Sequence, residues 1–299
     1  MMKFYSHGKL LLSGEYMVLK GAKSLALPCK KGQSLEFEPD GSKKLKWESW
    51  DIDHQLWFSA TIVIADFDVI ETSDLKTAEN LVTILKAIRR QKNSFLKNEG
   101  GKVTTRLEFD LHWGLGTSST LISNLAQWSQ TDPYALLEAS FGGSGYDIAC
   151  ATANGPLIYQ KGSKGAEIQM CEFDPPFKSN LYFVYLNQKK NSREAVNQFK
   201  KQKISPKQIT QSSELTESMI RAKSLKKFEQ ILIEHERFIG NILGIKPVKE
   251  KLFSDFGGSV KSLGAWGGDF VLACGDQNTP EYFINKGFPV VLGYQEMML

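Results

Sequence analysis

The run HWGLGTSST, from His112 to Thr120, lies between two segments of different periodicity. Upstream, apolar side chains alternate with charged ones between residues 102 and 111, which predicts a half-buried strand. Downstream, apolar residues recur from Leu121 to Trp128 at the spacing of an amphipathic helix. The sequence therefore predicts a strand, a glycine loop and a helix, in that order.

The start of this predicted helix is suited to bind an anion. The first turn of a helix has N–H groups without intrahelical partners and carries about half a unit of positive charge. Gly114 and Gly116 permit a close approach to the main chain, and residues 117–120 add four hydroxyl groups. A helix cap after a tight turn explains the same pattern equally well, so the loop needs support from other motifs.

The length of 299 residues predicts two domains of ordinary size. The run DPPFKSN breaks the pattern at Asp174, so we place the domains at residues 1–173 and 174–299. The first domain begins with short strands over residues 1–72. Its predicted helices span residues 74–91, 118–129 and 132–140, and those of the second domain span residues 191–202, 206–221, 224–243 and 279–286. This order predicts an α+β fold rather than a regular βαβ alternation, and argues against a nicotinamide-binding sheet.

Charge and cysteine content exclude several classes of protein. The net charge of +4 is too small to predict a nucleic-acid or membrane partner. The four cysteines lie far apart without a CxxC pair, which predicts neither a zinc site nor a disulfide framework. No secretory signal or apolar run of membrane-spanning length is present, so we expect a cytoplasmic protein.

Three further glycine-containing segments are candidates for chemistry. They are HGKLLLSGEYMVLKG from His7, GGSGYDIACATANG from Gly142 and VKSLGAWGGDFVLAC from Val260. Taken singly, each has a plain structural explanation: a solvated lysine, an aspartate that caps a helix, and a hairpin turn.

Together with the loop, these segments resemble the motifs of the GHMP kinases, the small-molecule kinases that include homoserine, mevalonate, phosphomevalonate and galactose kinases. HGKLLLSGE resembles the family pattern PGKxxLxGE, GLGTSST resembles the phosphate loop GLGSSAA, and GAWGGD resembles the carboxyl-terminal glycine motif. GSGYDIA is similar to the SGxD segment of mevalonate and phosphomevalonate kinases, and the ending GGD is more similar to phosphomevalonate kinases. The resemblance covers nearly the whole chain.

The resemblance implies a two-domain GHMP kinase fold. Its amino-terminal ATP-binding domain would be ribosomal protein S5 domain 2-like, with a left-handed βαβ element, and its carboxyl-terminal domain would be ferredoxin-like. ATP and Mg²⁺ would be the cofactors. The residues implied to wrap the ATP phosphates are His112, Trp113, Gly114, Leu115, Gly116, Thr117 and Ser118.

The same resemblance implies roles for individual side chains. Ser118 and Glu138 would bind Mg²⁺, although Glu138 stands closer to the SGxD segment than in mevalonate kinases, and a surface glutamate is the alternative. Lys9 would stabilise the transferred phosphoryl group, and Asp147 would lie beside it at the acceptor. The residues implied to bind the acceptor are Lys190, Ser192, Arg193 and Gly267, with a solvated basic face as the alternative for the first three.

The chain departs from the family pattern at four positions. His7 replaces proline, and Ser119 and Thr120 replace two alanines after the phosphate loop. Trp266 stands where glycine is usual in the last motif. We expect such a large ring to reshape the acceptor pocket, which affects the substrate more than the fold.

Our leading hypothesis is a kinase that transfers the γ-phosphoryl group of ATP to a mevalonate- or phosphomevalonate-like acceptor, acting as a monomer or homodimer. The alternative is a catalytically altered homologue that binds nucleotide as a sensor or partner protein. A related decarboxylase activity would release CO₂ as well as ADP. A nucleic-acid module based on the lysines between Lys189 and Lys207 ranks last, because aromatic residues are sparse among them.

Overall fold

The computed structural model describes residues 1–163, 165–188, 196–197, 199–266 and 268–299. Its contacts divide the chain into two compact units that interleave in sequence. Unit 1 contains residues 1–8, 31–111 and 115–152, and unit 2 contains residues 9–30, 112–114 and 153–299. The domain boundary between residues 173 and 174 stays a prediction. Among the described residues, no helix combines the length and apolar character that a bilayer crossing requires.

The sheet of unit 1 accounts for the β-rich start of the chain. Its strand order is β5 (Val69–Thr72), β4 (Leu56–Val63), β3 (Lys44–Trp50), β6 (Gly101–Leu107) and the second half of β2 (Ser24–Pro39). Neighbouring strands are antiparallel except β3 and β6, which are parallel. Strand β1 (Met2–Leu11) also pairs with β2. The strand predicted before the glycine loop ends at Leu107 rather than at residue 111, and SLALPC and SLEFEP form one continuous strand, β2.

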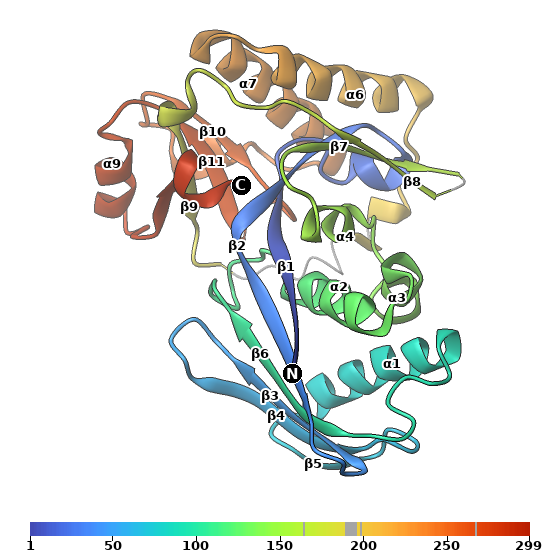
Figure 1. Ribbon diagram of the computed structural model, residues 1–299. Helices are drawn as coiled ribbons and strands as arrows, with labels where there is room; N and C mark the ends of the chain where they lie inside the picture. The colour runs from blue at the N-terminus through green and yellow to red at the C-terminus, as the bar shows by residue number, and fades with distance from the viewer. Residues whose placement is uncertain (164, 189–195, 198, 267) are drawn as a thin grey trace. The chain divides into compact units, whose positions relative to one another are not determined.

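Three helices of unit 1 agree closely with the predicted ranges. They are α1 (Leu75–Gln91), α2 (Thr117–Ser129) and α3 (Pro133–Ser140), and the unit also contains α4 (Tyr146–Ala151). The side chain of Asp74 accepts a hydrogen bond from the Thr77 N–H and so caps α1. Apolar side chains of α1, α2 and α3 form one core cluster with those of β2, β3, β4 and β6. Figure 1 shows the course of these helices and strands. This cluster anchors the helix that follows the glycine loop.

Unit 2 contains an antiparallel sheet of four strands. Their order is β10 (Ser259–Ser262), β11 (Phe270–Cys274), β9 (Leu181–Tyr185) and β12 (Val291–Gly293). Helices α8 (Val248–Leu252) and α9 (Thr279–Asn285) share a core with three of these strands. The unit also contains η1 (Met17–Lys20), β7 (Leu157–Gly162), β8 (Gly165–Met170), η2 (Lys178–Asn180), α6 (Pro206–Arg221), α7 (Leu225–Leu243) and α10 (Tyr294–Met297). The predicted α+β class is confirmed, whereas half of the helix predicted at 191–202 lies outside the described residues.

Candidate active site

The glycine loop turns sharply into α2, as the sequence predicts. Gly114 has a φ of 66° and Gly116 a φ of 97°, both in the region that favours glycine. Gly116 is the N-cap of α2 and has no side chain to accept from the first-turn N–H groups. The start of α2 therefore combines a glycine cap with the positive end of a helix of 13 residues.

The four hydroxyl groups after Gly116 divide into two pairs. Ser119 and Thr120 are buried, and the Ser119 hydroxyl donates to the Gly116 carbonyl at 2.9 Å. The Thr120 hydroxyl donates to Oε1 of Gln33 at 2.7 Å. Ser118, in contrast, is exposed. Ser119 and Thr120, which depart from the family pattern, therefore point inward, and Ser118 stays accessible to a ligand.

The first part of the loop, residues 112–114, belongs to unit 2. The Tyr185 hydroxyl donates to the main-chain carbonyl of His112 at 3.1 Å. The Trp113 ring meets the Phe270 ring edge-on, with 5.6 Å between centroids. Since Tyr185 ends β9 and Phe270 begins β11, the central strands of the small sheet hold this part of the loop. Sequence reasoning gave neither aromatic residue a role.

Two charged side chains of unit 2 reach Gly114. The Lys9 ammonium donates to the Gly114 carbonyl oxygen at 2.7 Å. The carboxylate of Asp269 lies against Gly114 so closely that a Cβ added to this glycine would overlap its Oδ2 atom. The first motif predicts a role for Lys9, whereas the sequence assigns no role to Asp269, the last residue of GGD. An acid directly after two glycines and before a strand was the available sequence signal.

Ser118, Glu138 and Asp147 all lie in unit 1. Asp147 is in the first turn of α4, where its Oδ1 accepts from the Ile148 N–H at 3.1 Å, and α4 packs against α2. Burial and then the charge of Asp147 raise the pKa of the Tyr134 hydroxyl to about 12, so this tyrosine stays neutral beside the carboxylate. Glu138 is exposed on α3. In the described part of the chain, no group of three histidine, cysteine or acidic side chains is arranged to hold a metal.

No protein-family model and no curated protein matches the sequence, whereas solved structures match its fold over nearly the whole chain. The Methanococcus jannaschii mevalonate kinase superposes with a TM-score of 0.72 at 14% identity, covering 100% of this chain and 98% of that one. The Streptococcus pneumoniae phosphomevalonate kinase, in complex with phosphomevalonate and AMPPNP, has a TM-score of 0.70 at 16% identity, covering 98% of this chain and 100% of that one. This chain has the GHMP kinase fold.

The GHMP kinase fold confirms the family resemblance drawn from the four motifs, at the level of architecture. A D-glycero-D-manno-heptose 1-phosphate kinase from Bacteroides thetaiotaomicron is also similar, with a TM-score of 0.66 at 14% identity over 99% of this chain and 95% of that one. The solved structures similar to this chain are thus named as kinases of different acceptors, and the fold by itself does not select among these acceptors.

Within this GHMP kinase fold, several predicted positions stay predictions. Lys190, Ser192, Arg193 and Gly267 lie outside the described residues. Lys9 belongs to unit 2 and Asp147 to unit 1, so their predicted convergence stays a prediction.

Trp266, the largest departure from the GHMP kinase motifs, has a structural role. Its φ is 56°, in the region that favours glycine. The side chain is only 2% exposed and packs in an apolar cluster with Tyr16, Met17, Phe199 and Ile239. The ring therefore fills a core site, a role that the sequence did not indicate.

Proposed function

We propose that this protein is an ATP-dependent kinase that transfers the γ-phosphoryl group to a small acceptor similar to mevalonate or phosphomevalonate. The observation that carries this proposal is the hydrogen bond from Lys9 to the carbonyl of Gly114. It joins the lysine of the first GHMP motif to the glycine loop that precedes α2. The two motifs are 105 residues apart in sequence, so their contact is a property of the fold.

The residues of the loop fit a nucleotide. The positive end of α2, the glycine cap and the exposed Ser118 provide main-chain donors and a hydroxyl group. The Streptococcus pneumoniae neighbour contains AMPPNP, an ATP analogue, which also favours ATP here. Mg²⁺, when bound with ATP, would neutralise phosphate charge, and Ser118 and Glu138 are its proposed protein ligands.

Phosphoryl transfer depends mainly on positioning and on neutralising charge at the transferred group. The Lys9 ammonium donates a hydrogen bond to the Gly114 carbonyl, which holds this positive charge at the glycine loop. In the proposed mechanism Lys9 directs a donor to the phosphoryl oxygens, and the main chain of residues 112–118 orients the polyphosphate. Asp147 orients the acceptor and takes the proton of an attacking hydroxyl group.

The role of Asp147 separates two classes of acceptor. A hydroxyl group keeps its proton at pH 7, so a carboxylate base contributes about 10²- to 10⁴-fold in rate. A phosphate monoester has a second pKa near 6 and is already largely ionised. We therefore expect Asp147→Asn to abolish most activity toward mevalonate and to spare more of the activity toward phosphomevalonate. Lys190, Ser192, Arg193 and Gly267 are the proposed contacts of the acceptor.

Release of ADP with a panel of acceptors tests this proposal. The panel contains mevalonate, phosphomevalonate, homoserine and sugars, and the products are analysed for a new phosphate ester and for CO₂. For the active acceptor we expect Lys9→Ala to lower kcat about 10²- to 10³-fold. If Lys9→Ala changed KM but left kcat unchanged, Lys9 would have no role in stabilising the transferred phosphoryl group.

The alternative is a homologue that binds nucleotide without turnover, as a sensor or partner protein. Its motivation was the departures at Ser119, Thr120 and Trp266, and the structure gives all three side chains internal contacts. Calorimetric binding of AMPPNP by a protein that releases no ADP with any acceptor would favour this alternative. We further propose a cytoplasmic monomer or homodimer without nucleic-acid or membrane partners.

A further inference from the structure

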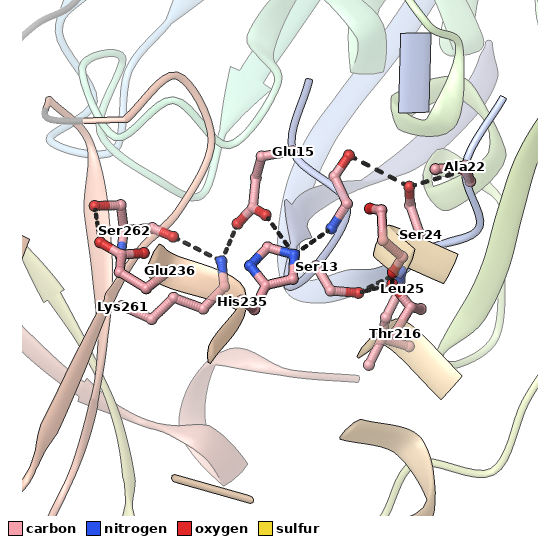
Figure 2. A network of polar contacts seen from close by, with 12 residues as sticks. Ser13, Glu15, Ala22, Ser24, Leu25, Thr216, His235, Glu236, Lys261 and Ser262 are labelled. Carbon is pink, nitrogen blue, oxygen red and sulfur yellow. Dashed lines mark hydrogen bonds and ion pairs between the residues drawn. The ribbon is translucent and has the colours of Figure 1, made fainter. Parts of the chain in front are cut away.

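The turn after β1 is linked to the glycine motif by a buried ion pair. The Lys261 ammonium donates to Oε1 of Glu15 and also to the Ser262 carbonyl at 2.8 Å (Figure 2). Glu15 is 1% exposed and Lys261 is fully buried. Glu15 follows β1, and Lys261 lies on β10, 246 residues further along the chain. The pair therefore connects the first and last GHMP motifs within unit 2.

Two further contacts join the same segments. The Tyr16 hydroxyl donates to the Ala265 carbonyl at 2.9 Å. The rings of Tyr16 and Trp266 share one buried apolar cluster. We call Glu15, Tyr16, Lys261, Ala265 and Trp266 the motif junction.

The ion pair of the motif junction is not an efficient way to stabilise a fold. Burying two charges is costly, and an apolar pair of similar volume is often at least as stable. Oε2 of Glu15 and Nδ1 of the adjacent His235 have no hydrogen-bond partner in the described part of the chain. Nε2 of His235 accepts from the Gly14 N–H at 3.0 Å, which fixes the main chain next to Glu15. Such directional contacts specify one arrangement more than they add stability.

The motif junction has a counterpart at the glycine loop. Lys9 lies six residues before Glu15, and Asp269 lies eight residues after Lys261. Lys9 and Asp269 both contact Gly114, as described above. The segments 9–15 and 261–269 are therefore each fixed at both ends, at one end by the motif junction and at the other by a contact with Gly114.

We propose that the motif junction is a positioning device that keeps Lys9 and Asp269 in register on either side of Gly114. Glu15, Tyr16 and Lys261 are positioning residues in this arrangement, since no contact described above joins any of them to Gly114. The expected effect of the junction on kcat rests on the proposed kinase function. Its effect on the main chain around Gly114 does not depend on that function.

Two variants and one matched control test the proposal. Tyr16→Phe removes one hydrogen bond and keeps the ring. The double variant Glu15→Gln/Lys261→Met removes both charges of the pair, while buried Glu236 keeps its hydrogen bonds from the Val248 and Ser262 N–H groups. Tyr294→Phe is the control, because the buried Tyr294 hydroxyl also donates to a main-chain carbonyl, that of Phe173 at 3.0 Å, away from the junction.

Hydrogen exchange of the amides in residues 9–17, 112–114 and 263–266 is measured for all four proteins, at a temperature well below unfolding. We expect the two junction variants to exchange about tenfold faster than the wild type in these segments, and the control variant to match the wild type there. With an active acceptor, we expect kcat to fall about 10- to 100-fold in the junction variants while KM for ATP changes little.

Unchanged exchange in both junction variants would overturn the positioning proposal, whatever the activity. The proposal would also be overturned if kcat fell only in proportion to the thermal unfolding midpoint of each variant, and fell equally in Tyr294→Phe. A wild-type chain that turns over no acceptor would instead overturn the proposed kinase function. In that case the exchange experiment still decides whether the junction positions the loop.

Discussion

At the scale of single residues, Gly114 is constrained by its conformation and by its neighbour. A φ of 66° is unfavourable for any residue with a Cβ, at a cost of about 1–2 kcal/mol. In addition, the space that its Cβ would need contains the carboxylate of Asp269. The loop glycine thus makes room for a charged group as well as for a turn.

We predict that Gly114→Ala destabilises the protein more than Gly41→Ala does. Gly41 has a similar φ of 72°, but no atom lies within 4 Å of the position of its Cβ. Gly41→Ala should therefore cost only the strain, about 1–2 kcal/mol in urea unfolding. Adding Asp269→Ala to Gly114→Ala should recover part of the difference, and equal costs at the two glycines would contradict the steric argument.

Ser118 and Thr120 should respond to substitution in opposite ways. Thr120→Val removes the donor to the buried Oε1 of Gln33 and should cost about 1–3 kcal/mol of unfolding free energy. Ser118→Ala removes an exposed hydroxyl and should change stability by less than about 0.5 kcal/mol, while raising the Mg²⁺ concentration needed for activity. Urea unfolding and Mg²⁺ titration of both variants check this. A Ser118→Ala variant with unchanged Mg²⁺ dependence would remove Ser118 as a metal ligand.

At the scale of elements, the β10 to β11 connection combines a glycine-like conformation with a large side chain. Trp266 has a φ of 56°, in the region that favours glycine, yet its ring fills an apolar cluster with residues of η1 and α7. The free energy gained by burying a tryptophan exceeds the cost of its positive φ, since the two are about 3–5 and 1–2 kcal/mol.

Trp266→Gly should therefore destabilise the protein by about 1–4 kcal/mol, although it restores the family residue. Urea unfolding followed by far-UV circular dichroism measures the change without relying on tryptophan fluorescence. Trp266→Phe should lose less, because it keeps an aromatic ring in the cluster. A Trp266→Gly variant as stable as the wild type would show that the cluster gains little from the ring.

At the scale of the whole molecule, buried ionisable groups make stability depend on pH. Burial, and then the charge of Lys261, lower the pKa of His235 well below its usual value. The unfolded chain therefore takes up a proton below about pH 6.5 that the native state does not, so this group lowers stability as pH falls. Burial raises the pKa of Glu15 to about 7 despite the opposing charge of Lys261, so that group lowers stability as pH rises from about 4.5 to 7.

The two effects oppose each other between about pH 4.5 and 6.5, and His235→Gln should separate them. The amide can still accept from the Gly14 N–H, but it does not titrate. The excess stability of the wild type over this variant should grow by about 2 kcal/mol from pH 5 to pH 7, at about 1.4 kcal/mol per pH unit below 6.5. Urea unfolding at several pH values measures the difference, and a difference independent of pH would show that His235 titrates normally.

The sequence by itself located the local features of this protein. It predicted α1, α2, α3, α6, α7 and α9 to within about one residue, because apolar spacing and capping residues act over a few positions. Its motifs also predicted the glycine loop, Lys9 and Asp147 as site residues, and the fold of solved GHMP kinases agrees with the family resemblance of those motifs, while the roles of the residues stay predictions.

Only the tertiary structure decided which polar groups face inward. A hydroxyl group looks the same in sequence whether it is exposed, as in Ser118, or bonded to Gln33, as in Thr120. The contact of Lys9 with Gly114 joins residues 105 positions apart, and the pair of Glu15 with Lys261 joins residues 246 apart. No local pattern encodes such partners, because the groups that offset the cost of burying a charge lie far apart in sequence and meet only in the folded chain.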